Sequence, residues 1–493
     1  MIDAHNYVDG VWQPIGNGTF NSYLASDASP LARAPVSGAK EVDQAVAAAR
    51  RAFLASEWRD TSGAERAAAL LKIADELNRQ REPVARLIAQ EMGKPYRISL
   101  TREVDGAIDK LRFFAGAARA LDGRTVGATK PELLDMTLPE PVGVCALIIP
   151  WNDPVDLAIR KLGAAIAAGC TVVMKSSEIT PASTAALFEV IHDSGALPPG
   201  VANLIHGPGD PTGTALVGHP DVAKISFTGS TATGSRIMQQ AGKRLAKLSL
   251  ECGGKLASIV FADADLDRCL DAVSYGAFMY TGQSCTACTR LLVERPIYEQ
   301  VLNDLVARSS KFKVGDPLED GVLVGPMASR IQFQRVASYI DLALKEGATA
   351  LLGGRPDPDA TYIMPTILTG DLAGSRIARE EIFGPVLIVL PFDTEEEAIA
   401  MANDTDYGLG GAIWTSRINR ALRMMRKLDV ADVWVNTHYV RHTETPYGGR
   451  HMSGLGRELG MAGVEEYVSW KRVCVDTRDD YHMKVWFEQS GQA

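Results

Sequence analysis

The sequence predicts an α/β protein with a doubly wound parallel sheet, and three observations lead to this fold class. Short β-branched runs alternate with helical segments from Val144 to Leu250, which is the pattern of parallel strands joined by crossover helices. The connections between them are short, as in sheets that bind nucleotides at the carboxyl ends of their strands. A second strand–helix series starts after Gly253-Gly254, and the 493 residues of the chain exceed what one hydrophobic core holds.

The first series consists of five predicted strands and three predicted helices. The strands are Val144–Ile149, Thr171–Met174, Ala202–Ile205, Lys224–Phe227 and Leu245–Leu250. The helices are Pro154–Ala168, Thr180–Ser194 and Ala232–Ala241. We expect a nucleotide to bind where these strands end.

The second series continues to about Gly449. Its first elements are strand Ala257–Phe261, helix Leu266–Phe278, strand Leu291–Val293 and helix Ile297–Arg308. The first hundred residues look mainly helical, and the helices expected there to cover the first sheet are Ala39–Leu54, Ser62–Arg79 and Arg81–Met92. Tyr7–Trp12 contains Asp9-Gly10 and resembles a small edge hairpin.

This organisation predicts three parts. Residues 1–122 and 142–252 form a Rossmann-like nucleotide-binding domain, and residues 253–452 form a second α/β domain. Residues 123–141 and 468–493 form a small β arm and tail, because Thr125–Leu138 is β-prone and the tail carries Val473–Val475 and Val485–Phe487. Extended arms of this kind often pair across subunits.

The composition is that of an ordinary soluble globular protein, with 46% hydrophobic and 23% charged residues. A net charge of −9 argues against nucleic acid or an anionic membrane as a partner. The N-terminus lacks the pattern of a secretory signal, and the longest apolar run, Val142–Pro150, is far shorter than the ~20 residues of a membrane span. Seven scattered cysteines fit a reducing cytoplasm better than a disulfide framework.

Cys285 closes the segment YTGQSC at 280–285. A cysteine in a glycine-containing loop after a helix can be exposed near backbone N–H groups, which favour the nucleophilic thiolate. Considered alone, a buried apolar cysteine is the commoner interpretation. Cys285 and Cys288 also form a CxxC, but no further ligands stand at a spacing suited to zinc, and the segment lacks the context of a redox motif. We therefore expect no metal site.

Glu251 stands at the end of an apolar strand and is followed by two glycines. Burial raises the pKa of a carboxyl group and makes it a competent general base near neutral pH. The alternative is a structural ion pair with Lys255 or Arg244, and for this residue alone that alternative is the stronger one.

Asn152 lies between a central strand and the helix that follows it. Its amide can donate a hydrogen bond to a developing oxyanion. Asp153 directly precedes Pro154, which favours a helix N-cap at Asp153. Since that cap is occupied by Asp153, capping is a less natural role for Asn152.

Two further segments suggest a cofactor site. Lys175 and Glu178 follow a strand and project into the expected nucleotide crevice, where an acidic residue can bind ribose hydroxyls. Gly229 and Ser230 open a helix whose N-terminus can hold a pyrophosphate. The glycines at 229 and 234 are not a GxGxxG motif, so this pattern is weak by itself.

The order and spacing of these motifs resemble the aldehyde dehydrogenase superfamily along essentially the whole chain. The matching motifs are PWN at 150–152, MKSSE at 174–178, FTGS at 227–230, ECGGK at 251–255, GQSC at 282–285, EIFGP at 381–385, PYGG at 446–449 and SGLGRE at 453–458. The resemblance implies a non-acylating, NAD(P)-dependent enzyme that oxidises a small-molecule aldehyde to the carboxylic acid, with residues 253–452 as its catalytic domain. It also implies a homodimer or homotetramer whose arm pairs across subunits.

The resemblance assigns roles to individual residues. Cys285 would attack the aldehyde, and the oxyanion would rest on the Asn152 amide and the Cys285 backbone N–H. Glu251 would activate the water that hydrolyses the thioester, and Lys161 and Glu458 would relay the proton. The implied cofactor residues are Trp151, Lys175, Glu178, Gly229, Ser230, Glu381 and Phe383. Glu178 favours NAD, although small serines beside it leave NADP possible.

Three positions depart from the family pattern. Tyr280 replaces the usual asparagine, Asp153 replaces a common aromatic residue, and Cys252 replaces leucine. The helix after PWN often lines the substrate tunnel in this family. Its polar residues here are Asp153, Asp156 and Arg160, with Arg441, His442 and Tyr447 near the other wall.

Two interpretations of this polar helix stay open. A polar tunnel would suit a substrate with a hydroxyl, amine or carboxylate group, and Arg160→Ala would then raise KM for an anionic aldehyde more than for a neutral one. The alternative is a helix cap plus an ion pair between Asp156 and Arg160, which contributes only ~0.3–0.5 kcal/mol where it is exposed.

Three other functions are less consistent with the sequence. A CoA-acylating semialdehyde dehydrogenase is disfavoured because such relatives usually lack the residue that matches Glu251. An inactive structural protein on the same fold is disfavoured because Cys285, Glu251, Asn152 and Glu381 are all present. A cysteine hydrolase would need a histidine partner, and none of the eight histidines stands in a comparable motif.

Overall fold

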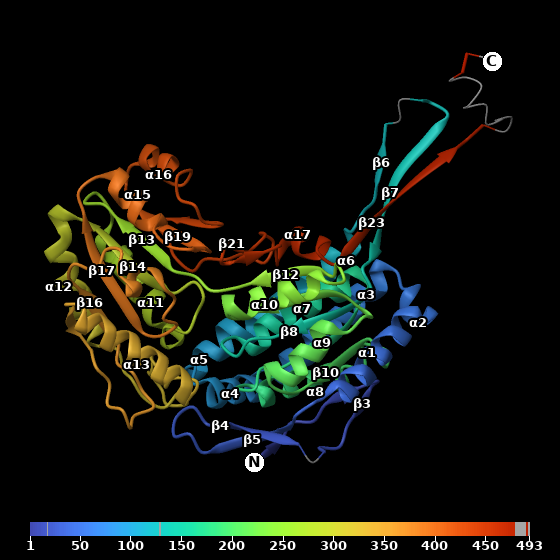
Figure 1. The fold of residues 1–493 in the computed structure, drawn as a ribbon, viewed down its shortest axis with the longest axis horizontal. Coiled ribbons are helices and arrows are strands. Elements are labelled where there is room, and N and C mark those ends of the chain that lie inside the picture. Colours follow the sequence, from blue (N-terminus) through green and yellow to red (C-terminus); the bar gives the residue numbers. More distant parts are fainter. Residues whose placement is uncertain (17, 128–129, 479–489, 492–493) are drawn as a thin grey trace.

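The computed structural model describes residues 1–16, 18–127, 130–478 and 490–491. Figure 1 shows two large sheets in separate parts of the molecule and a three-stranded arm that projects from one of them. The predicted α/β class is confirmed.

The first large sheet contains eight strands. Their order is β22 (Gly454–Leu455), β12 (Lys247–Glu251), β11 (Val222–Thr228), β8 (Val144–Ile148), β9 (Thr171–Lys175), β10 (Ala202–Ile205), β2 (Tyr7–Val8) and β3 (Val11–Trp12). The five strands from β12 to β10 are parallel, as predicted. The predicted hairpin at Tyr7–Trp12 is confirmed as the edge pair β2–β3.

Helices cover this sheet. They are α1 (Ala39–Leu54), α3 (Gly63–Arg79), α4 (Arg81–Met92), α6 (Asp105–Arg119), α7 (Pro154–Ala168), α8 (Pro181–Asp193) and α10 (Thr231–Gly242). All fifteen residues of α7 are buried, so this helix lies inside the body rather than on its surface. Pro154 at its first turn and Gly169 in the left-handed conformation (φ 90°) end it where the sequence predicted.

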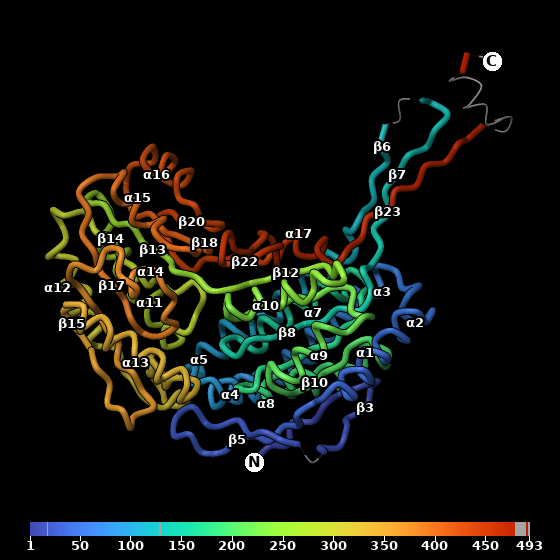
Figure 2. The backbone as a smooth tube through the Cα atoms, viewed as in Figure 1, coloured from blue at the N-terminus to red at the C-terminus, as the bar shows by residue number. Residues whose placement is uncertain are grey.

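The second large sheet contains seven strands. Their order is β15 (Thr349–Leu352), β16 (Thr366–Thr369), β17 (Val386–Phe392), β14 (Cys288–Glu294), β13 (Leu256–Val260), β19 (Gly410–Trp414) and β20 (Asp432–Val435). Its helices include α11 (Leu266–Phe278), α12 (Tyr298–Ser309), α13 (Arg330–Lys345), α15 (Glu395–Asn403) and α16 (Ile418–Met424). The chain passes from β12 to β13, and so from one sheet to the other, through Gly253-Gly254 (Figure 2).

The arm consists of β6 (Arg124–Val126), β7 (Leu133–Pro141) and β23 (Val468–Asp476). The β7–β23 pairing runs from Val468 opposite Pro141 to Asp476 opposite Leu133. This confirms the extended character predicted within Thr125–Leu138 for residues 125–126 and 133–138, and that predicted for Val473–Val475. Residues 130–132 form a turn, and residues 128–129 lie outside the described residues. The predicted run Val485–Phe487 lies outside the described residues.

A small sheet near the N-terminus was not predicted. It has the order β1 (Ile2–Asp3), β5 (Pro30–Pro35), β4 (Thr19–Tyr23). Among its buried residues are Ser22, Ala32 and Ala34, which are small. The segment therefore lacks the alternation of large apolar residues that identifies a strand. In the described part of the chain, no helix has the length and apolarity needed to cross a bilayer.

Candidate active site

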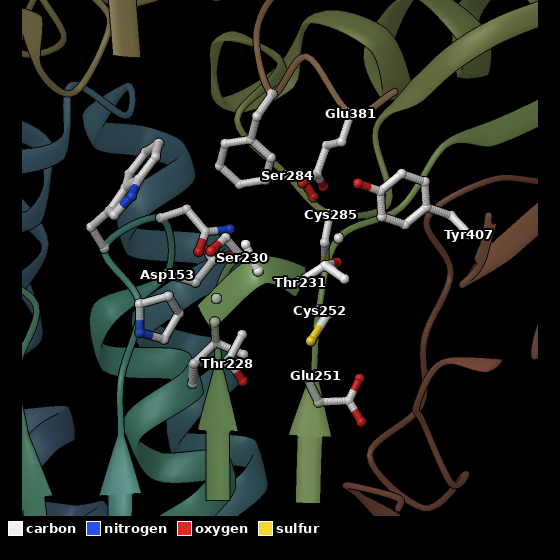
Figure 3. Close-up of a pocket in the computed structure, with 18 of the residues that line it drawn as sticks. Asp153, Thr228, Ser230, Thr231, Glu251, Cys252, Ser284, Cys285, Glu381 and Tyr407 are labelled. Atoms are coloured by element: carbon white, nitrogen blue, oxygen red, sulfur yellow. The ribbon is translucent and has the colours of Figure 1, made fainter. Parts of the chain in front are cut away.

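A cavity of about 390 Å³ lies where the carboxyl ends of β8, β11 and β12 face the second sheet's body. We call each large sheet with its helices a body. The body of the eight-stranded sheet contributes Asn152, Thr228 and Glu251, and the body of the seven-stranded sheet contributes Cys285 and Glu381. Figure 3 shows Thr228 and Glu251 at the ends of two strands, with Cys285 and Glu381 above them. The structure thus brings together residues that lie far apart in the chain.

The crossing at Gly253-Gly254 explains why the two bodies meet so closely here. A Cβ atom at Gly253 would collide with the Glu381 carboxylate, and one at Gly254 would collide with the carbonyl oxygen of Cys285. At Gly254 the obstacle is backbone, so only glycine fits, whereas at Gly253 a side chain would have to displace the end of Glu381.

Cys285 follows a tight turn that ends α11. Tyr280 and Thr281 both have positive φ values, 56° and 57°, which is unusual for residues with a side chain. The turn leaves Cys285 half-buried on the cavity wall, with its Sγ 3.5 Å from the hydroxyl of Tyr447. The other cysteine of the CxxC, Cys288, is fully buried in β14.

The charge state of Cys285 differs from the sequence expectation. Burial raises the pKa of its thiol, and this effect exceeds the lowering by Arg441, the Tyr447 hydroxyl and Arg160. The expected thiolate is therefore corrected to a thiol at neutral pH, because desolvation disfavours the charged form. A base has to remove its proton during reaction.

Glu251 has the properties of such a base. Neither carboxyl oxygen has a hydrogen-bond partner among the described residues, and the side chain is buried. Burial, and then the nearby charge of Glu458, raise its pKa well above the ordinary value. The structural ion pair is wrong, since Arg244 donates instead to the backbone carbonyls of Val217 and Val222. Lys255 likewise has no hydrogen bond from its Nζ within the described part of the chain.

Lys161 and Glu458 form a buried ion pair next to Glu251. Lys161 Nζ also lies 3.1 Å from Ser226 Oγ. The backbone of Glu458 pairs with that of Tyr447 through two hydrogen bonds of 2.7 Å. This pair sits behind the cavity wall rather than on it, because neither Lys161 nor Glu458 lines the cavity.

Asn152 and its neighbours lie at the end of β8. Asn152 is buried on the cavity wall, and the ring of Trp151 meets Phe383 edge-on, with 5.3 Å between ring centroids. Asp153 takes the N-cap position of α7, but its side chain makes no capping hydrogen bond. The prediction that the Asp153 side chain caps the helix is therefore wrong, because that side chain forms an ion pair with Lys94 instead.

Lys94 belongs to a buried cluster that the sequence did not predict. Its ammonium group pairs with both Asp153 and Glu103 and lies 4.1 Å from the centroid of the Tyr280 ring. Glu103 also accepts a 2.9 Å hydrogen bond from the Val155 N–H. Tyr280 and Asp153, two of the departures from the family pattern, thus contact the same cation.

Several predicted cofactor residues line the cavity, namely Trp151, Gly229, Ser230, Glu381 and Phe383. Ser230 caps α10, whose N-terminus opens here, and one carboxylate oxygen of Glu381 accepts the Gly254 N–H at 3.0 Å. Burial raises the pKa of Glu381 to about 7. A helix N-terminus and a buried carboxyl with remaining acceptor capacity fit the pyrophosphate and ribose of a dinucleotide.

Lys175 and Glu178 lie farther out. They do not line this cavity, and Glu178 borders a neighbouring apolar cavity of about 530 Å³. Lys175 Nζ donates to the Ser176 carbonyl at 2.8 Å and lies 3.9 Å from the Glu178 carboxylate. Both residues still stand at the carboxyl edge of the sheet, where β9 ends.

The predicted polar helix reaches the site from another side. A second cavity, of about 220 Å³, shares Asp153, Arg160, Ser284 and Arg441 with the first. Asp156 pairs with Lys110 at 2.7 Å and with Arg160 at 3.3 Å. The helical ion pair is thus present, and it is buried at the junction of the two cavities rather than exposed.

Comparisons with known proteins agree with the geometry. The sequence profile of the aldehyde dehydrogenase family matches residues 12–473. The chloroplastic betaine aldehyde dehydrogenase of Amaranthus hypochondriacus is 39% identical over 487 residues, or 96% of each chain. The peroxisomal aminoaldehyde dehydrogenase 1 of Pisum sativum is 39% identical over 484 residues, again 96% of each. The NAD⁺ complex of an aldehyde dehydrogenase from Bacillus cereus has a TM-score of 0.94 and 37% identity, with 97% of each chain covered.

Proposed function

The chain belongs to the aldehyde dehydrogenase family and is an NAD(P)-dependent enzyme, and we propose that it oxidises an aldehyde to the carboxylic acid through a thioester on Cys285. One observation supports this proposal most directly. The same cavity is lined by the half-buried thiol of Cys285, the amide of Asn152 and the buried carboxyl of Glu251, which has no hydrogen-bond partner among the described residues.

The first step is the addition of Cys285 to the aldehyde. The Sγ atom bonds to the carbonyl carbon, the thiol proton goes to a base, and the carbonyl oxygen becomes an oxyanion. The Asn152 amide and the Cys285 backbone N–H donate hydrogen bonds to that oxygen. Glu251 has the raised pKa and the vacant oxygens that a base needs.

The cofactor would be held by Glu381, Phe383 and the N-terminus of α10 at Ser230, with Lys175 and Glu178 at its outer end. When bound, NAD supplies the two-electron acceptor that converts the tetrahedral carbon on sulfur to a thioester. The residues of this chain orient the reacting carbon and keep the sulfur bonded to it.

Hydrolysis of the thioester needs an activated water. Glu251 takes the proton of that water, the hydroxide oxygen bonds to the acyl carbon, and the carbon–sulfur bond breaks to free the acid. The ion pair of Lys161 and Glu458 lies next to Glu251 and would pass the proton outward. Because Glu251 is present, water rather than CoA is the proposed acyl acceptor.

Purified protein with NAD and a panel of aldehydes, followed by NADH absorbance, tests the proposal. We expect turnover in the native chain, an acyl adduct on Cys285 after acid quench, and loss of both in Cys285→Ala. Cys474→Ser, at an exposed cysteine of the arm, is the matched control and should keep native activity. A native rate in Cys285→Ala would reject the mechanism, and a product found only as an acyl-CoA would favour the CoA-acylating alternative.

The cofactor preference follows from Glu178. Its carboxylate repels a 2′-phosphate, so we expect at least about tenfold preference for NAD over NADP. Equal kcat/KM values for the two cofactors would contradict this. Two relatives are named for betaine aldehyde and for aminoaldehydes, which are cationic. The panel should therefore compare cationic aldehydes with neutral ones first.

We also propose a homodimer or homotetramer in a reducing cytoplasm. The arm exposes large apolar side chains that a partner would cover, namely Val126, Leu134, Leu138, Trp470 and Val475. All seven cysteines are free thiols, which fits a reducing compartment. Light scattering of the native chain and of Leu134→Lys, which places a charge on this face, tests the assembly.

A further inference from the structure

Arg441 stands at the junction of the two cavities described above. It lines both of them, together with Asp153, Arg160 and Ser284. Its guanidinium carbon lies 4.5 Å from the centroid of the Tyr447 ring, and the hydroxyl of Tyr447 is 3.5 Å from Cys285 Sγ. A single tyrosine side chain therefore separates this cation from the reacting sulfur.

The charge of Arg441 has no carboxylate partner. Among the described residues no Asp or Glu oxygen lies within 4.0 Å of it, and its buried Nε has no hydrogen bond. One terminal nitrogen donates to the Thr286 hydroxyl, which orients the side chain without neutralising it. The carboxylate whose charge it feels most is that of Asp432, beyond ion-pair distance.

The cations on and beside α7 are paired with carboxylates. Arg160 lies 3.3 Å from Asp156 and 3.5 Å from Glu458. Lys110 pairs with the same Asp156, and Lys161 with the same Glu458. Asp156 and Glu458 thus pair with three cations, and Glu251 lies near two of them, Lys161 and Arg160. Arg441 is left without a carboxylate at ion-pair distance among the described residues.

The acidic residues that the structure describes in the second cavity also leave Arg441 without a partner. Asp153 is paired with the buried Lys94, and Asp109 accepts a 2.8 Å hydrogen bond from the Thr443 hydroxyl, which leaves its negative charge in place but beyond ion-pair distance of Arg441. Arg102 adds another cation to the same wall. A guanidinium without a partner in a partly desolvated site binds a carboxylate strongly, because its fork matches the two oxygens.

We propose that Arg441 binds a carboxylate at the far end of the substrate, so that the preferred substrate is an aldehyde that also carries an acid group. The aldehyde end would lie at Cys285 and the acid end at the junction of the cavities. This inference rests on the proposed function of Cys285. It assigns to Arg441 the selectivity that the sequence placed on Arg160, whose charge is already shared between two carboxylates.

Matched aldehydes of four to six carbons that end in carboxylate, methyl or ammonium test the selectivity. We expect the native enzyme to prefer the carboxylate series over the methyl series, and the ammonium series to be poorest. Arg441→Gln should lower the carboxylate-to-methyl ratio of kcat/KM by about 30-fold or more. The change should appear mainly in KM, because the variant loses the ion pair with the substrate carboxylate. Arg441→Lys should keep part of the preference, and Arg417→Gln, at an exposed arginine that lines neither cavity, should keep all of it.

A second measurement needs neither turnover nor NAD. Alkylation of Cys285 by iodoacetate, an anion, and by iodoacetamide, which is neutral, is followed by mass spectrometry of the Cys285 peptide. We expect Arg441→Gln to slow the reaction with iodoacetate several-fold more than that with iodoacetamide. If both reagents slow equally, or all aldehydes lose activity equally, Arg441 acts only on the reactivity of the sulfur and the proposal is overturned.

The two measurements separate this inference from the proposed function. If no aldehyde is oxidised but iodoacetate selectivity depends on Arg441, the anion site stands and the dehydrogenase mechanism fails. If aldehydes are oxidised with no preference for an acid group, the mechanism stands and the anion site fails. A melting curve of each variant establishes that it is folded.

Discussion

Glu91 in α4 and Glu251 at the end of β12 are both buried glutamates of the first body, yet their surroundings differ. Glu91 accepts four hydrogen bonds, from the Ser22 hydroxyl at 3.0 Å, the Ala182 N–H at 3.0 Å, and the Ser183 N–H and hydroxyl at 2.8 and 2.6 Å. Glu251 accepts none from the described residues. Burial raises the pKa of both carboxyls, to about 7 for Glu91 and well above the ordinary value for Glu251.

The same contrast separates whole regions. In the scaffold beside α4, Glu103 forms an ion pair with Lys94 and accepts a hydrogen bond from a backbone N–H. In the cavity, Glu381 accepts one N–H and Glu251 none among the residues described. A buried carboxyl without partners costs stability. Glu251 lines the same cavity as Cys285, so the unpartnered carboxyl lies in the candidate active site, whereas the fully hydrogen-bonded Glu91 lies in the scaffold.

The largest effect is expected at Glu251. Glu251→Gln removes the base without breaking a hydrogen bond, so kcat should fall by about 10²–10⁴-fold. The melting temperature should stay the same or rise, because an unpartnered acid becomes neutral. Stopped-flow NADH measurement should show one rapid turnover followed by slow hydrolysis. Glu299→Gln, on an exposed helix face, is the control, and a large loss of stability in Glu251→Gln would break the comparison.

Lys94 tests the scaffold side. Lys94→Met leaves Glu103 and Asp153 buried without their cation and should destabilise the protein by about 3–5 kcal/mol. Thermal or urea unfolding measures this. Adding Glu103→Gln removes one of the two orphaned acids, so the double variant should recover part of the loss. Strictly additive effects would show that the two residues do not interact.

Glu91 is expected to matter less. Glu91→Gln replaces an acceptor oxygen with a donor and leaves one or two of the four donors unmatched, at a cost of about 1–3 kcal/mol. Because Glu91 lies outside the cavity, kcat should change less than about twofold. Unfolding and steady-state kinetics on the same preparation measure both. A selective loss of activity in a stable protein would contradict the structural role assigned to Glu91.

The smallest effect concerns Glu381 and pH. Its pKa of about 7 means that the carboxyl gains a proton as pH falls from 8 to 6. The neutral form is a weaker hydrogen-bond acceptor for the ribose hydroxyls of the proposed NAD site. We therefore expect KM for NAD to rise about 3–10-fold toward pH 6 and to stay nearly constant in Glu381→Gln. The same slope in both would remove Glu381 from the cofactor site.

Much of the architecture was predictable from local pattern. Helix α7 has the bounds Pro154–Ala168 that the sequence predicted, because Pro154 and Gly169 mark its two ends. The parallel strands were recognised from continuous β-branched runs, since a strand buried on both faces needs apolar side chains on both. The small N-terminal sheet was missed because the residues it buries include Ser22, Ala32 and Ala34 rather than large apolar ones.

The residues of the candidate site could be predicted from the sequence, but their contacts could not. The motifs around Asn152, Glu251 and Cys285 identified residues that do line one cavity. The partners of these residues were not predictable. Asp153 contacts Lys94, 59 positions away, and Arg441 contacts Thr286, 155 positions away. Nothing in the local sequence of either residue signals the contact.

By itself, the sequence determined which residues are candidates for the site and where most strands and helices lie, because both depend on residue type and near-neighbour periodicity. Only the tertiary structure decided how deeply these side chains are buried and which groups surround them. Whether a carboxyl is satisfied, a thiol is protonated or an arginine is free depends on burial and on groups from distant segments, and these are brought together only when the two sheets pack.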